Sequence, residues 1–98
     1  MRMVHMYIDH IKDELDGARE YAEKYIDFKA RGHSNRANAY KGMAQDELRH
    51  AGTVYEFAVQ DMEAIGSIYT LPDDVAEAWD HFLKHYADCT AKIKMMLA

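Results

Sequence analysis

The chain has 98 residues, of which 49% are hydrophobic and 30% are charged, and its formal net charge is −5. These values are typical of one soluble globular domain and exclude a disordered tail. Acids are spread along the whole chain, so we expect no nucleic-acid partner and no membrane partner. A chain this short buries a modest core alone, and its seven Met and seven Tyr favour packing against a partner. We therefore expect a homodimer or a larger homo-oligomer.

Cysteine usage and the first residues bear on the compartment. Cys89 is the only cysteine, so an internal disulfide is impossible, and no CxxC pair is present for a zinc ribbon or a rubredoxin-type iron site. The first ten residues contain an acid and two histidines where a signal peptide needs an uninterrupted apolar run. No apolar run approaches transmembrane length. We expect a cytoplasmic protein.

The first predicted helix covers about residues 3–30, and Gly32 follows its end. At about 100° per residue its apolar side chains form one stripe, and most of its acids project to the opposite side. Glu14 is the exception, because it lies on the edge of the stripe. The stripe consists of Val4, Ile11, Leu15, Ala18, Ala22 and Tyr25.

The second predicted helix covers about residues 35–65, with Ser34 as its expected N-cap. Glu47 falls near the centre of its apolar stripe, and His50 lies on the flank beside it. A carboxylate desolvated without partners costs several kcal/mol, so this placement calls for cations, hydrogen-bond donors or a metal ion. The stripe consists of Tyr40, Met43, Ala44, Ala51, Val54, Ala58 and Ile65.

The third predicted helix covers about residues 73–97 and begins directly after Pro72. Its apolar stripe contains no acid, and His81 and His85 fall on the opposite, polar face. No segment shows the period-two alternation of a strand, so the fold class is all-α. The chain is therefore read as a single helical domain over residues 1–98. The stripe consists of Val75, Trp79, Phe82, Leu83, Tyr86, Ile93 and Leu97.

A tight turn near Gly32 folds the first two helices into an antiparallel hairpin. Residues equally far from the turn become neighbours, so Glu47 and His50 face roughly the level of Glu14. A Glu and a His spaced i, i+3 project from one helix face, which lets both bind one ion while the carboxylate reaches a second ion. One hairpin thus offers two carboxylates and one imidazole.

The segment AQDELRHA, residues 44–51, together with Glu14 and with Tyr21 one heptad later, resembles the first half of the ferritin-like superfamily of ferritins, bacterioferritins and rubrerythrins. The resemblance covers about residues 8–58 and implies a four-helix bundle with a di-iron or di-manganese site. It implies that Glu14 is a terminal ligand, that Glu47 bridges both ions, and that His50 is the nitrogen ligand. It also implies catalytic roles for Glu47 and for Tyr21, which matches a tyrosine often found near such sites.

A complete member of this superfamily has a second Glu-x-x-His, and this chain has none. Two hairpins related by a twofold axis restore the set, because they supply Glu14, Glu47 and His50 twice. This arrangement resembles the encapsulated ferritins, short chains whose metal site forms at a subunit interface. An encapsulin-type shell is a possible partner, but the C-terminal KIKMMLA reads as helix without a shell-docking tail and does not indicate one.

An oxygen-rich pocket with two imidazoles prefers Fe(II) or Mn(II) to soft Cu(I). The resemblance implies a ferroxidase or a related di-iron oxidase or peroxidase, with two iron ions per dimer interface and Mn or Zn as alternative metals. Two other functions stay open. One is a non-enzymatic interaction or assembly protein whose polar cluster is held by hydrogen bonds or by an ion pair with Arg36 or Lys41. The other is a divalent-metal binder without redox chemistry.

Several residues outside the predicted metal site also have expected roles. For Asp61 we expect a salt bridge at the end of the bundle and no ligand role. His10 either orients a ligating carboxylate or packs at the edge of the core. His81 and His85 could chelate an ion at spacing i, i+4, but solvation on a polar face is the simpler expectation. Cys89 is expected to act as a small apolar residue.

Overall fold

The computed structural model describes all 98 residues and contains three α-helices and no strand. These helices are α1 (Arg2–Ala30), α2 (Ser34–Gly66) and α3 (Asp73–Met96). The all-α class is confirmed, and each helix begins and ends within one residue of its predicted position. None of the three combines the length and apolar character that a membrane crossing requires.

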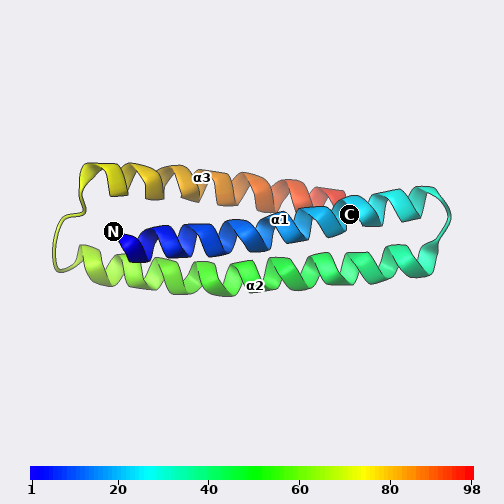
Figure 1. Cartoon of the computed structure of the whole chain (residues 1–98), viewed down its shortest axis with the longest axis horizontal. Helices are drawn as coiled ribbons and strands as arrows, with labels where there is room; N and C mark the ends of the chain where they lie inside the picture. Colours follow the sequence, from blue (N-terminus) through cyan, green and yellow to red (C-terminus); the bar gives the residue numbers. More distant parts are fainter.

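The three helices run side by side in an elongated bundle of 55 × 19 × 18 Å (Figure 1). α1 and α2 form the antiparallel hairpin, and α3 runs along α1 in the same direction as α1. α3 ends well before the α1–α2 turn, so the tip of the hairpin extends beyond it. The hairpin is therefore the longer structural unit, and α3 covers only part of it.

The turn between α1 and α2 is closed by backbone hydrogen bonds around Gly32. Gly32 has a φ of 81°, which a residue without Cβ adopts with little strain. The backbone N–H of His33 donates to the carbonyl of Phe28 at 2.9 Å, and that of Gly32 donates to the carbonyl of Lys29 at 3.1 Å. This pair of bonds is the Schellman motif, and the rings of Phe28 and His33 pack at 6.1 Å, as the motif favours.

The predicted cap of α2 is wrong. Ser34 is the first helical residue, His33 holds the N-cap position, and no side chain caps the helix. The reason is that the turn is one residue shorter than expected, because His33 both closes α1 and starts α2.

The core contains 16 buried hydrophobic residues and no buried polar residue. All six residues of the predicted α1 stripe are buried. On α2 the buried line is different, because it follows alanines spaced by seven residues. Tyr40 and Val54 are half-buried and Met43 is 40% exposed, so Glu47 lies beside the buried line and not at its centre. The buried residues of α2 are Ala37, Ala44, Ala51, Ala58 and Met62.

Aromatic rings join α3 to the hairpin. Tyr55 of α2 stacks on Tyr86 of α3 with the ring centroids 4.0 Å apart and the planes nearly parallel. Phe82, which is 1% exposed, lies beside both rings. These contacts place α3 against one side of the hairpin and leave the other side open.

Candidate metal centre

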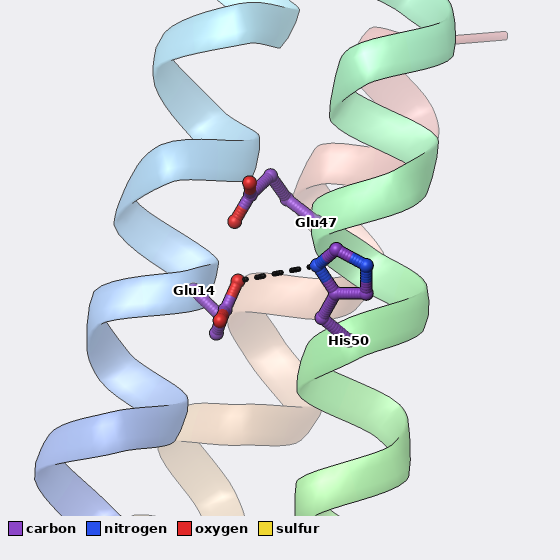
Figure 2. Close-up of side chains that lie close together, drawn as sticks. All are labelled: Glu14, Glu47 and His50. Carbon is purple, nitrogen blue, oxygen red and sulfur yellow. Dashed lines mark ion pairs between the residues drawn. The ribbon is translucent and has the colours of Figure 1, made fainter.

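Glu14 of α1 and Glu47 and His50 of α2 point toward one another across the hairpin (Figure 2). One ligand atom from each residue lies within 4.8 Å of the other two. The group lies near the middle of both helices, on the open side, since α3 passes behind the hairpin in this view. The structure thus brings together the three residues that the sequence analysis assigned to one site, and their role as ligands stays a prediction.

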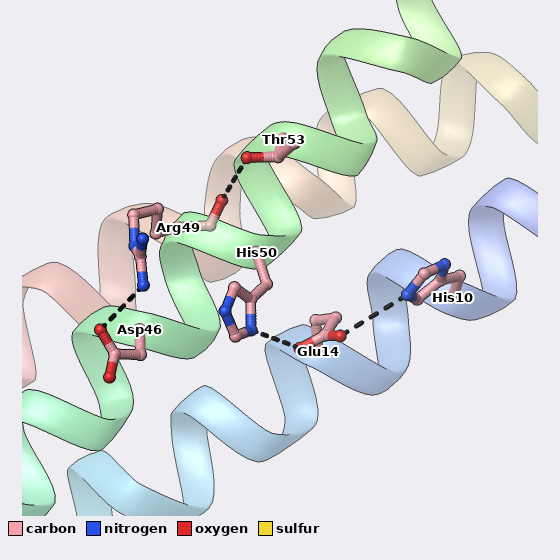
Figure 3. A network of polar contacts seen from close by, with 6 residues as sticks. All are labelled: His10, Glu14, Asp46, Arg49, His50 and Thr53. Atoms are coloured by element: carbon pink, nitrogen blue, oxygen red, sulfur yellow. Dashed lines mark hydrogen bonds and ion pairs between the residues drawn. The ribbon is translucent and has the colours of Figure 1, made fainter.

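Glu14 lies between two imidazoles (Figure 3). Its Oε2 is 3.7 Å from Nδ1 of His50, and its Oε1 is 3.5 Å from Nε2 of His10. The Glu14 side chain is 22% exposed, whereas those of His50 and His10 are 51% and 56% exposed. The carboxylate therefore lies inside the groove between the helices, and the imidazoles form its solvent-facing rim.

The pKa values of the two carboxyl groups are shifted in opposite directions. A hydrogen bond to Glu47 holds the pKa of Glu14 below its ordinary value, and the positive charges of His50 and His10 lower it further against the effect of burial. The same hydrogen bond, with burial and the negative charge of Glu14, raises the pKa of Glu47. Of the two carboxyl groups, Glu47 is therefore the one that loses its proton at the higher pH. Two carboxylates this close favour either a shared proton or a cation between them.

Gly17 makes room for the Glu47 carboxylate. It is the only glycine of α1, and a Cβ at this position would lie 3.3 Å from Oε2 and 3.5 Å from Cδ of Glu47. Glycine inside a helix is unfavourable by about 1 kcal/mol relative to alanine. The sequence reasoning missed Gly17, although a lone glycine in the middle of a long helix was a signal that something packs closely against it.

No lysine or arginine pairs with either glutamate within the chain. The guanidinium of Arg36 lies 6.0 Å from the centroid of the Phe28 ring, and the ammonium of Lys41 lies 5.5 Å from that of Tyr25. Arg49 pairs with Asp46 at 3.2 Å on the outer surface of α2 (Figure 3). The imidazoles are thus the only side chains in the chain that can bring positive charge to Glu14.

Tyr21 lies two helical turns along α1 from Glu14. Its ring is half-buried and packs on Tyr40 of α2, with the centroids 6.1 Å apart. Tyr40 in turn stacks on Phe28 at 5.5 Å, which gives the tip of the hairpin an aromatic cluster. The catalytic role expected for Tyr21 stays a prediction.

Asp61 has a different partner from the one expected. It accepts a hydrogen bond from the hydroxyl of Tyr7 on α1, and this bond is the main reason that the pKa of Tyr7 is raised. Asp61 forms no salt bridge within the chain, because its partner on α1 is a neutral phenol. The contact ties the far end of α2 to the start of α1.

The two histidines of α3 differ from each other. His81 is exposed, as expected, but His85 is half-buried and its Nε2 lies 3.4 Å from Sγ of Cys89. His85 and Cys89 line a cavity of about 380 Å³ between α1 and α3, together with Leu15 and Arg19. The prediction that His85 is solvated is wrong, because α3 lies along α1 and covers that flank.

The donor set suits a hard divalent cation. Two carboxylates and one imidazole converge in a half-buried groove, and oxygen-rich sets with imidazole bind Fe(II), Mn(II) and Zn(II). The raised pKa of Glu47 and the space that Gly17 leaves for it fit this use, because a nearby cation stabilises two carboxylates that otherwise repel each other. One hairpin supplies half of the six ligands of a two-metal site.

No family model, no curated protein and no solved structure matches this chain.

Proposed function

We propose that two copies of the chain pair through the open side of the hairpin and hold two metal ions between them. In this ferritin-like arrangement the four helices of two hairpins form one bundle, with Glu14, Glu47 and His50 contributed twice. The observation that carries the proposal is the convergence of these three ligands within 4.8 Å on the one side of the hairpin that α3 leaves uncovered. Exposed apolar side chains on the same side, Met43 at 40% and Phe57 at 53%, support burial against a partner.

The residues of α2 on the open side of the hairpin would match those of a second copy of α2 that runs in the opposite direction. Its residues fall into pairs equidistant from the midpoint between Leu48 and Arg49, and each pair joins compatible chemistry: opposite charges, two aromatic rings, two apolar chains and two ligands. This pattern supports a twofold axis that passes through the metal site at right angles to the helices. The pairs are Arg36 with Asp61, Tyr40 with Phe57, Met43 with Val54, and Glu47 with His50.

The proposed reaction is the oxidation of Fe(II) by dioxygen or peroxide. Two Fe(II) ions held side by side supply two electrons to the oxidant. In this proposal Glu47 and Glu14 would supply the carboxylate ligands and His50 would supply the nitrogen ligand, with Glu47 bound in its deprotonated form. A reducing cytoplasm, in which Cys89 stays a thiol, suits the supply of Fe(II).

The experiment that tests this function is anaerobic loading with Fe(II), followed by admission of air. We expect about one iron per chain in a dimer or larger assembly, and an absorbance change of an oxo-bridged diferric centre on oxidation. Glu47→Gln should abolish both signals, whereas Glu56→Gln, which changes an exposed acid of the same helix, should leave them intact. A folded oligomer without stoichiometric metal would leave the site as a polar structural cluster. Stoichiometric metal without oxidation would make the chain a non-redox metal binder.

A further inference from the structure

A second group of metal-binding side chains lies on α1, toward its N-terminus from Glu14. Met3, Met6 and His10 line one small cavity of about 210 Å³, with Tyr7 as its remaining wall. Their spacing of three and four residues puts the three side chains on one face of the helix, where neighbours of this spacing meet. Neither cysteine nor carboxylate lines this cavity, so its donor atoms are two thioether sulfurs and one imidazole.

In the single chain the donor atoms are accessible. Met6 is 63% exposed, Met3 is half-buried, and the side chain of His10 is 56% exposed. Tyr7 does not compete as a ligand, because its hydroxyl donates to Asp61. An exposed methionine gains little from the core, so packing within the chain does not account for Met6.

One ring nitrogen of His10 lies beside a carboxylate. Its Nε2 is 3.5 Å from Oε1 of Glu14, and Nδ1 has no partner within the chain. Histidine ligands commonly bind metal through one ring nitrogen while the other faces a carboxylate, which orients the ring. In His10 this placement leaves Nδ1 as the nitrogen that can bind a metal ion.

Soft donors select soft ions. Thioether and imidazole ligands favour Cu(I), which accepts two to four ligands, whereas Fe(II), Mn(II) and Mg(II) prefer oxygen. We propose that Met3, Met6 and His10 form a binding site for Cu(I), distinct from the oxygen-rich site of Glu14, Glu47 and His50. The two sites differ in metal preference because of their donor atoms, and a single carboxylate, Glu14, lies between them.

The test uses Ag(I), which has the same preference as Cu(I) and is not redox-active under the conditions of titration. The full-length chain carries Cys89→Ala, because a thiol would bind soft ions first. With ¹³C-methyl methionine, NMR resolves the seven methionines separately. At one equivalent of Ag(I) we expect the methyl signals of Met3 and Met6 to shift and that of Met95, which is 77% exposed, to stay in place.

Matched variants make the test decisive. Met6→Leu and His10→Gln should each weaken Ag(I) binding by about tenfold or more, while Met95→Leu and His81→Gln should not. Leucine keeps the apolar surface of methionine, so Met6→Leu separates a ligand from a residue that only packs against a second copy. Shifts of all exposed methionines alike, no shift at one equivalent, or full affinity in Met6→Leu would overturn the proposal. Mn(II) binding measured with Met6→Leu tests the site of Glu14, Glu47 and His50 independently of the proposed Cu(I) site.

Discussion

The opposite pKa shifts of Glu14 and Glu47 make the stability of the metal-free chain depend on pH. The pKa of Glu47 is raised above its ordinary value of 4.5, so its contribution is present below that value and is lost as pH rises through the raised pKa. The pKa of Glu14 is lowered, so its contribution is present above its ordinary value and is lost as pH falls through the lowered pKa. The pair therefore stabilises the fold most at mildly acid pH.

We expect Glu47→Gln to flatten this dependence, because glutamine keeps a hydrogen-bond donor toward Glu14 and cannot lose it. The free energy of unfolding, measured by urea denaturation without metal from pH 4 to pH 7, should fall more steeply with rising pH in the unaltered chain than in Glu47→Gln. Distant groups contribute equally to the free energy of unfolding of both chains, so their contribution drops out of the difference. A difference that is constant over this range would contradict the raised pKa of Glu47.

Gly17→Ala should separate folding from metal binding. Alanine favours the helix by about 1 kcal/mol over glycine, but its Cβ would press on the Glu47 carboxylate at 3.3 Å. We expect unchanged or slightly raised stability in urea and Mn(II) affinity lowered by about tenfold, as for a displaced ligand. Gly42→Ala is the matched control, because a Cβ there would meet nothing within 4 Å. Equal Mn(II) affinity in both variants would show that Glu47 does not need the space.

At the scale of elements, the sequence predicted the three helices well, because glycine, proline and apolar periodicity mark their ends strongly. The buried face of α2 was predicted less well. A wheel at 100° per residue drifts by about 20° per heptad against a seven-residue repeat, and over a helix of 33 residues this drift moved the expected centre from the alanine line toward Glu47.

In the candidate site, the sequence pattern predicted which ligands face one another but not the contacts around them. Helical spacing and the length of the turn sufficed to place Glu14 opposite Glu47 and His50. The role of Gly17 and the direction of His10 depend on atoms from another helix or another turn, so spacing alone could not give them. The flank of His85 was misjudged because nothing in α3 itself tells which side α1 covers.

The α1–α2 turn carries a prediction of its own. Gly32→Ala should lower the free energy of unfolding by about 1 kcal/mol, because a residue with a Cβ at a φ of 81° is strained even in open space. Gly66→Ala is the control, since that glycine has an ordinary φ and equal space. Urea denaturation of both variants gives the comparison. Equal loss in the two variants would show that the backbone of Gly32 is not decisive.

At the scale of the whole molecule, the reversed pairing of α2 predicts a charge contact between copies. Arg36→Glu and Asp61→Arg should each weaken the dimer, and the double variant should restore it. Two symmetric surface pairs at up to about 1 kcal/mol each correspond to roughly tenfold or more in the dimer dissociation constant. Sedimentation equilibrium measures this constant. Arg19→Glu, which changes an arginine paired with Glu23 inside the chain, controls for net charge. Asp61→Arg also removes the hydrogen bond from Tyr7 within the chain, so the double variant is compared with Asp61→Arg, which carries the same loss. No recovery relative to Asp61→Arg would exclude this orientation.

The position of the ligands at the middle of the hairpin bears on how two copies align. An apolar face that repeats every seven residues tolerates sliding by a heptad, since similar side chains meet again after each slip. Such a slip moves one helix by about 10.5 Å along the other, which separates the two ligand sets beyond the reach of a common ion. Bound metal would then favour one alignment over several others of similar packing energy. Formation of the aligned dimer would therefore depend on the presence of the ion.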